Sequence, residues 1–220
     1  MPEKNMTTRR ETRDLAMAVV QALQMWSNIR YRPFLNRAKP GTLTEEWFRW
    51  FAGAWNVART IKGGSQGAVR HYLDREFRTE LKEGGGAEAV DAAARHIQQQ
   101  GWSSGKNGKG SLPISLVSKI GFFLCPERLV PLDRYAVQGL NGLQHTSGAT
   151  RLKGPSYQEY LEAFDEQYAK MEPQLVAALR APWVIALASK LGCPAKALQT
   201  IAMRRKLFDD YLMHSGEYQR

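Results

Sequence analysis

The chain has 220 residues, of which 43% are apolar, so it is long enough for one large domain or for two small ones that bury a real core. Its 31 Lys and Arg residues against 21 Asp and Glu residues give a net charge of +10 at pH 7, which indicates a polyanionic partner, most commonly nucleic acid. The cysteines form no Cys-x-x-Cys pair and no apolar run approaches the roughly 20 residues of a membrane helix, which excludes a disulfide framework and a membrane partner and predicts a cytoplasmic protein.

Apolar residues recur with a helical period along most of the chain. In residues 11–27, Leu15, Val19, Leu23 and Trp26 share one stripe. No segment alternates as an exposed strand would, and Pro182 is expected to kink or split the helix that contains it. The pattern predicts an all-α protein with helices over residues 11–27, 42–61, 67–82, 87–100, 111–124, 133–143, 156–171, 172–192 and 194–213.

The domain organisation has two interpretations. Residues 1–220 form a single all-α domain, or they form two helical lobes, over about 1–100 and 101–220, with an active site between them. No internal repeat or low-complexity linker marks a boundary. We expect the protein to be a monomer.

Residues 102–113, WSSGKNGKGSLP, are the one long loop rich in glycine, serine and lysine. They do not match the Walker A pattern, because no Gly-Lys is followed by Ser or Thr at the required glycine spacing. Lys106 and Lys109 there either contact phosphates or belong to a solvated linker. Further candidate phosphate contacts are Arg32, Arg37, Arg151 and Lys153, in two other loops.

Other chemical signals are weak. Asp74, Glu80 and Lys82 follow the acid–acid–lysine order of a nuclease site. Because the segment is expected to be helical, we interpret them instead as charged residues that form ion pairs on an exposed helix face. Cys125 lies in an apolar run and is predicted to be a core residue. The histidines have no metal-ligand spacing, so no metal site and no cofactor are expected.

The segment SKIGFFLCPERLVPLD, residues 118–133, places two charged residues around an apolar run. Lys119 lies close to the start of the helix expected over 111–124, just off its apolar stripe, and Cys125-Pro126 ends that helix. Asp133 begins the next helix. Its plainest interpretation is an N-cap, and that of Lys119 is a partly buried surface lysine.

A resemblance adds a second interpretation. Leu-Pro, five residues and Lys119, followed by Val-Pro-Leu-Asp133 and a helix, resembles the core of the helix-hairpin-helix DNA glycosylases. It is most similar to bacterial proteins of the 8-oxoguanine-glycosylase fold, over the central third of the chain and weakly at RRKLFDDYL, residues 204–212. The hairpin glycines of that family are absent and the Lys-to-Asp spacing is shorter, so the hairpin motif is degenerate.

The resemblance implies a compact all-α glycosylase that flips a modified or damaged base out of double-stranded DNA and leaves an abasic site. Asp133 would stabilise the positive charge that develops on the sugar, and Lys119 would add a strand-cleaving lyase activity. Trp55 and Trp102 are candidates for the base pocket. The substrate is either 8-oxoguanine or a hypermodified phage cytosine, such as glucosylated hydroxymethylcytosine, the latter implying phage defence. A non-catalytic helical DNA-binding module and an effector nuclease are the alternatives.

Overall fold

The computed structural model describes residues 3–31, 41–105, 110–147 and 151–217. Within these ranges the chain is helical, and its only strand-like feature is an isolated antiparallel bridge between Ile61 and Ser103. The predicted all-α class is therefore confirmed. The more specific glycosylase fold stays a prediction.

The chain forms two compact units that interleave along the sequence. The first contains Met1–Arg32, Asp133–Pro155 and Glu159–Arg220, and the second contains Pro33–Leu132 and Ser156–Gln158. The lobe boundary expected near residue 100 falls inside the second unit. The location of the active site relative to these units stays a prediction.

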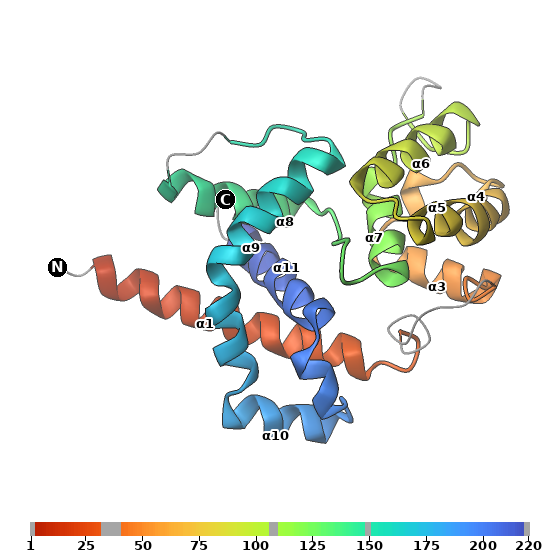
Figure 1. Ribbon diagram of the computed structural model, residues 1–220. Coiled ribbons are helices and arrows are strands. Elements are labelled where there is room, and N and C mark those ends of the chain that lie inside the picture. The colour runs from red at the N-terminus through yellow and green to blue at the C-terminus, as the bar shows by residue number, and fades with distance from the viewer. Residues whose placement is uncertain (1–2, 32–40, 106–109, 148–150, 218–220) are drawn as a thin grey trace. The chain divides into compact units, whose positions relative to one another are not determined.

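In the first unit, helix α11 packs against helices α8 and α1, which come from distant parts of the sequence (Figure 1). Two glycines let α8 and α11 approach closely. A Cβ atom at Gly139 of α8 would collide with the backbone of Leu212, and one at Gly216 of α11 would collide with the backbone of Tyr135. The helices of this unit are α1 (Glu3–Ser27), α8 (Arg134–Ser147), α9 (Tyr157–Leu179, of which the first two residues belong to the second unit), α10 (Pro182–Leu191), the short 3₁₀-helix Ala195–Gln199 and α11 (Ile201–Glu217).

In the second unit, helix α7 packs against helices α5 and α6. Val117, Ile120 and Phe123 of α7 are buried, as its apolar pattern predicts, and Leu116 is buried as well. The helices of this unit are α3 (Glu45–Ala54), the 3₁₀-turn Ala58–Thr60, α4 (Gln66–Tyr72), the π-helical turn Leu73–Phe77, α5 (Arg78–Lys82), α6 (Ala87–Gln99) and α7 (Ile114–Leu124).

The prolines of the C-terminal half behave differently from one another. The expected helix break before residue 172 is wrong, because α9 continues through Pro173, whose side chain is exposed, while Leu175 and Leu179 on the same helix are buried. Pro182, in contrast, starts α10 after a break, as expected. Among the described residues no single helix is long and apolar enough to span a membrane, although α9 and α10, bent by 72° at this break, reach that length and apolarity together.

Helix α11 carries a buried ion cluster in the core of the first unit. The Lys206 Nζ atom donates to Asp209 Oδ2 at 2.8 Å and to Asp210 Oδ1 at 2.5 Å, and all three residues are at most 2% exposed. Burial raises the pKa of Asp210 to about 7, because desolvation penalises the carboxylate more than Lys206 stabilises it. The same two carboxylates raise the pKa of Lys206.

We expect Asp210 to make the stability of the protein fall as the pH rises. Its pKa is about 7 in the folded protein against 3.8 for the exposed group, so the folded state binds the extra proton between about pH 4 and pH 7. The Asp210→Asn variant, which keeps an oxygen for Lys206, should therefore gain stability relative to the wild type on going from pH 5 to pH 8. Urea unfolding at both pH values measures this. An equal difference in free energy at the two values would contradict it.

Candidate functional site

Lys119 lies in the middle of α7 rather than near its start, and it is only 6% exposed. Its Nζ atom donates a hydrogen bond to the backbone carbonyl oxygen of Trp55 at 3.2 Å and lies 5.8 Å from the centre of the Trp55 ring. A buried ammonium gains from both contacts, because a carbonyl oxygen and the face of an indole ring are each electron-rich. The predicted lysine and one predicted pocket residue are thus in direct contact.

The Trp55 ring belongs to an aromatic row along α3. Trp47, Phe51 and Trp55 are four residues apart, and consecutive rings stack with centres 4.8 and 5.7 Å apart. Phe123 of α7 presents its edge to all three rings. Trp47 and Trp55 remain half-buried. The row is therefore packed into the core at Phe51 and remains partly exposed at its two tryptophans, of which Trp55 contacts Lys119.

The segment that leads from α7 to Asp133 is held to the second unit at two backbone positions. Tyr157, fully buried, uses its hydroxyl both to donate to the Val130 carbonyl at 2.7 Å and to accept from the Val130 N–H at 2.9 Å. The Leu132 N–H donates to the Ser118 hydroxyl at 2.9 Å. Ser118 directly precedes Lys119, and Leu132 directly precedes Asp133. The hydrogen bond therefore joins the backbone of the residue before Asp133 to the side chain of the residue before Lys119.

Cys125 ends α7 and is 4% exposed, which confirms that it is a core residue. Burial raises the pKa of its thiol, against the opposing effect of the Arg128 side chain, whose Nε atom lies 2.9 Å from the sulfur. The Arg128 guanidinium also donates to the carbonyl oxygens of Leu81 and Gly85. The thiol is thus kept protonated, and it supports the turn rather than acting as a nucleophile.

Asp133 caps helix α8, as its sequence position predicts. The Oδ1 atom accepts from the Tyr135 N–H at 2.9 Å, and the backbone carbonyl accepts from the Val137 N–H at 3.0 Å. The residue is half-buried, at the positive end of the helix dipole. Beside it, the exposed Arg134 stacks on the Tyr135 ring at 4.8 Å and donates to its hydroxyl. A carboxylate and a cation therefore lie side by side at the start of α8.

Asn141 of α8 fixes the segment that contains two predicted phosphate contacts. Its side-chain amide donates to the Leu152 carbonyl at 3.1 Å, and its carbonyl accepts from the Leu152 N–H at 2.7 Å. Arg151 and Lys153 flank Leu152 and are exposed. Both cations are thus presented to solvent from a segment that is tied to α8.

The remaining predicted site residues either lie outside the described residues or pack in another cluster. Arg32, Arg37, Lys106 and Lys109 lie outside the described residues. The half-buried Trp102 packs against His96, with ring centres 5.7 Å apart, in a cluster separate from the aromatic row of α3. Its role as a pocket residue stays a prediction.

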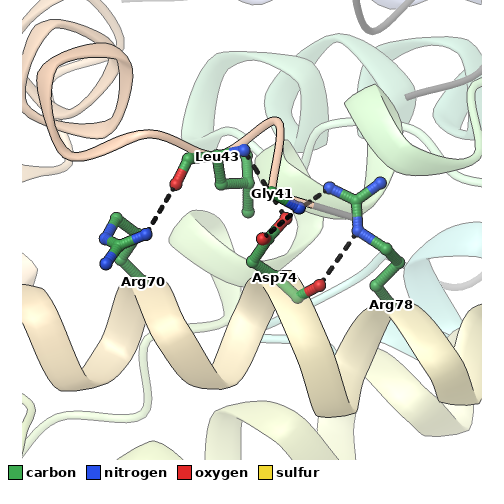
Figure 2. Close-up of polar contacts among 5 residues, drawn as sticks. All are labelled: Gly41, Leu43, Arg70, Asp74 and Arg78. Carbon is green, nitrogen blue, oxygen red and sulfur yellow. Dashed lines mark hydrogen bonds and ion pairs between the residues drawn. The ribbon is translucent and has the colours of Figure 1, made fainter. Parts of the chain in front are cut away.

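Asp74 corrects one prediction. It was expected on an exposed, ion-paired helix face, but it is 6% exposed and forms a buried ion pair with Arg78 at 2.6 Å. Its carboxylate also accepts from the backbone N–H groups of Gly41 and Leu43, and Arg70 donates to the Leu43 carbonyl (Figure 2). Asp74 sits in the π-helical turn, and the cluster anchors the segment that starts α3. Its contacts give it a structural role.

Several residues that shape the site escaped sequence analysis. Ser118, Tyr157 and Asn141 act through side-chain hydrogen bonds to distant backbone, for which no local sequence signal exists. Arg134 is the exception, because a basic residue adjacent to Asp133 can be recognised as a candidate DNA contact from the sequence. Among the described residues no group of three or more His, Cys, Asp or Glu side chains is placed to hold a metal ion.

Comparison of the chain with protein-family models, with curated proteins and with solved structures found no match.

Proposed function

We propose that this protein is a DNA glycosylase that flips a modified or damaged base out of double-stranded DNA and cleaves its N-glycosidic bond. The hydrogen bond between Leu132 and Ser118 carries this proposal, because it ties the residue before Asp133 to the residue before Lys119. Tyr157 reinforces the same segment at Val130. A reactive group whose backbone is fixed before the substrate binds is what such a reaction requires.

Asp133 is assigned the main role. Loss of the base leaves positive charge on the C1′ atom of the sugar, and a carboxylate beside it stabilises the transition state more than the ground state. The half-burial of Asp133 strengthens this effect, because water screens the charge less than at an exposed position.

Lys119 is assigned to the lyase branch. Its Nζ atom, which lies against the Trp55 carbonyl oxygen and ring, is the amine that attacks C1′. The aromatic row next to it, which ends at Trp55, supplies a surface on which an extruded base can stack.

DNA as the partner is supported by charge. The chain has a net charge of +10, and three exposed cations lie in α8 or in the segment tied to it by Asn141, namely Arg134, Arg151 and Lys153. For the substrate we propose a hypermodified phage cytosine, such as glucosylated hydroxymethylcytosine, or 8-oxoguanine.

A non-catalytic helical DNA-binding module is the second candidate, and the capping bond from Asp133 to Tyr135 favours it, because a capping role alone accounts for that residue. Such a module binds DNA in a salt-dependent way and releases no base.

The two candidates differ in one assay. We expect the purified protein to release free base from one of a panel of duplex DNAs that contain 8-oxoguanine or glucosylated hydroxymethylcytosine, and to leave abasic sites that alkali cleaves. Unmodified DNA of the same sequence is the control. DNA binding without base release from any member of the panel would support the binding module instead.

A further inference from the structure

A pocket of about 360 Å³ lies in the first unit, where the end of α9, helix α10, the 3₁₀-helix Ala195–Gln199 and the start of α11 meet. We call it the α10 pocket. Its volume falls in the range of ligand-binding sites in proteins. The apolar part of its wall is formed by Val176, Leu179, Ile185 and Leu198. None of the described residues that line it is assigned to catalysis.

Helix ends shape this pocket. Helix α10 is bent by 72° from α9 and has Pro182 as its first residue (Figure 1). Gly192 ends α10 in the left-handed conformation, with a φ angle of 68°, so that the chain turns into the 3₁₀-helix that forms one wall. The Thr200 hydroxyl accepts from the Met203 N–H at 3.1 Å and caps α11, which carries Arg204. Local backbone geometry therefore fixes the elements around the pocket.

The outer surface of α10 is apolar. Val184 and Ala188 of this helix are buried, whereas Trp183 is 48% exposed. Ile185, which lines the α10 pocket, is 51% exposed, and Ile201 at the start of α11 is 50% exposed. A single exposed apolar side chain is ordinary, but several on the elements around one pocket indicate an interaction surface.

The same part of the chain is positively charged. Residues 173–208 contain no Asp or Glu, and Arg180, Lys190 and Lys196 within them are exposed. Arg180 lines the α10 pocket, and its side chain has no ion pair or hydrogen bond among the described residues. The surface is therefore complementary to an anion.

Arg204, the second arginine in the pocket wall, is paired with Glu172 of α9. The Arg204 Nη1 atom lies 3.3 Å from Glu172 Oε1, which also accepts from the Tyr168 hydroxyl at 3.0 Å. A guanidinium has five N–H donors, so this contact leaves Arg204 able to bind a second carboxylate. Arg180 and Arg204 together against Glu172 leave the pocket with a positive charge.

The combination of apolar wall and arginine selects the chemistry of the partner. It favours an apolar side chain with a carboxylate beside it. DNA offers phosphates but would leave Trp183 and Ile185 without apolar contacts. An anionic bilayer would cover those two side chains, but an inserted side chain is what reaches Leu179, which is 3% exposed at the wall of the pocket.

We propose that this surface docks an acidic peptide segment of a partner protein, which places an apolar side chain in the α10 pocket and a carboxylate on Arg180 and Arg204. The choice of partner rests on charge complementarity and on the apolar surface around the pocket. It goes beyond the proposed function and does not depend on it, because none of the residues assigned to catalysis takes part.

The first experiment measures the binding of a fluorescein-labelled synthetic peptide of glutamate and leucine, in which the leucines recur at helical spacing, by fluorescence anisotropy. The wild type should bind this peptide more tightly than two matched peptides, one with lysine in place of glutamate and one with alanine in place of leucine. Arg180→Gln should weaken binding of the glutamate peptide about tenfold, because a charge-assisted hydrogen bond is lost. Ile185→Ser should weaken it several-fold, because it removes part of the apolar wall.

Arg95→Gln and Ile29→Ser are the matched controls. Arg95 is exposed on α6, and Ile29, which follows α1, is 76% exposed. Each control removes the same side chain as one pocket variant, at a position that does not line the pocket. Both should bind the glutamate peptide about as well as the wild type. Since all four substitutions change exposed side chains, we expect all four variants to fold, which urea unfolding verifies.

Three results would overturn the proposal: no binding of the glutamate peptide, equal affinity for it and either matched peptide, or losses in the controls as large as in the pocket variants. Co-sedimentation with phosphatidylserine vesicles and anisotropy with unmodified duplex DNA test the other partners. If the glutamate peptide does not bind, a loss of vesicle binding in Ile185→Ser would assign the surface to lipid. A larger loss of DNA binding in Arg180→Gln than in Arg95→Gln would then assign it to DNA. Because no measurement uses base release, failure of the glycosylase proposal remains a separate result.

Discussion

Asp133→Asn should lower the rate of base release by about 100-fold or more while DNA binding and folding survive. The substitution removes the negative charge that would stabilise the developing positive charge on the sugar. It retains the side-chain oxygen that accepts from the Tyr135 N–H, and asparagine caps helices about as well as aspartate. Single-turnover base release, anisotropy with the same DNA and urea unfolding measure the three properties separately.

Glu127→Gln is the matched control for this variant. Glu127 is an exposed carboxylate in the segment that leads from α7 to Asp133, six positions before Asp133. Glu127→Gln therefore removes one negative charge, as Asp133→Asn does, at a nearby position in the sequence. Its rate should stay near that of the wild type. If Asp133→Asn keeps full activity, the residue is only a helix cap and the proposed mechanism is wrong.

Lys119 should form a covalent bond with the sugar that borohydride can trap. In the proposed step the Lys119 Nζ atom bonds to C1′ as the bond from C1′ to the base breaks, the base leaves with the bonding electrons and gains a proton, and the amine loses one. Opening of the sugar gives a Schiff base, which borohydride reduces to a stable amine. We expect a protein–DNA adduct with the wild type and none with Lys119→Gln, resolved on a denaturing gel.

Lys119→Gln keeps a donor for the Trp55 carbonyl, so the α3–α7 contact that contains it should survive. Lys82→Gln is the control, because it removes an exposed amine from the same unit and should leave the adduct intact. An adduct that persists in Lys119→Gln would assign the bond to another amine. Absence of an adduct from the wild type would remove Lys119 from the covalent step and leave base release to Asp133 and water.

Local sequence signals predicted the parts of the candidate site that depend on local interactions. Pro113 and Cys125-Pro126 bound α7 because proline lacks an N–H group for a helix interior, and Asp133 caps α8 because its side chain reaches an N–H two residues away. The failure at Pro173 has the opposite origin. Leu175 and Leu179 are buried beyond it, so tertiary packing holds a helix together that the local rule would have ended.

The sequence alone therefore determined the all-α class, most helices and the positive charge, because these follow from periodicity, capping and composition. The pair of residues to be tested came from the resemblance to the helix-hairpin-helix DNA glycosylases. Only the tertiary structure decided that Lys119 is buried against Trp55, 64 positions away, and that Tyr157 holds Val130 across 27 positions. It also decided that the two units interleave along the sequence. Each of these depends on which distant segments pack together, and no local pattern encodes that choice.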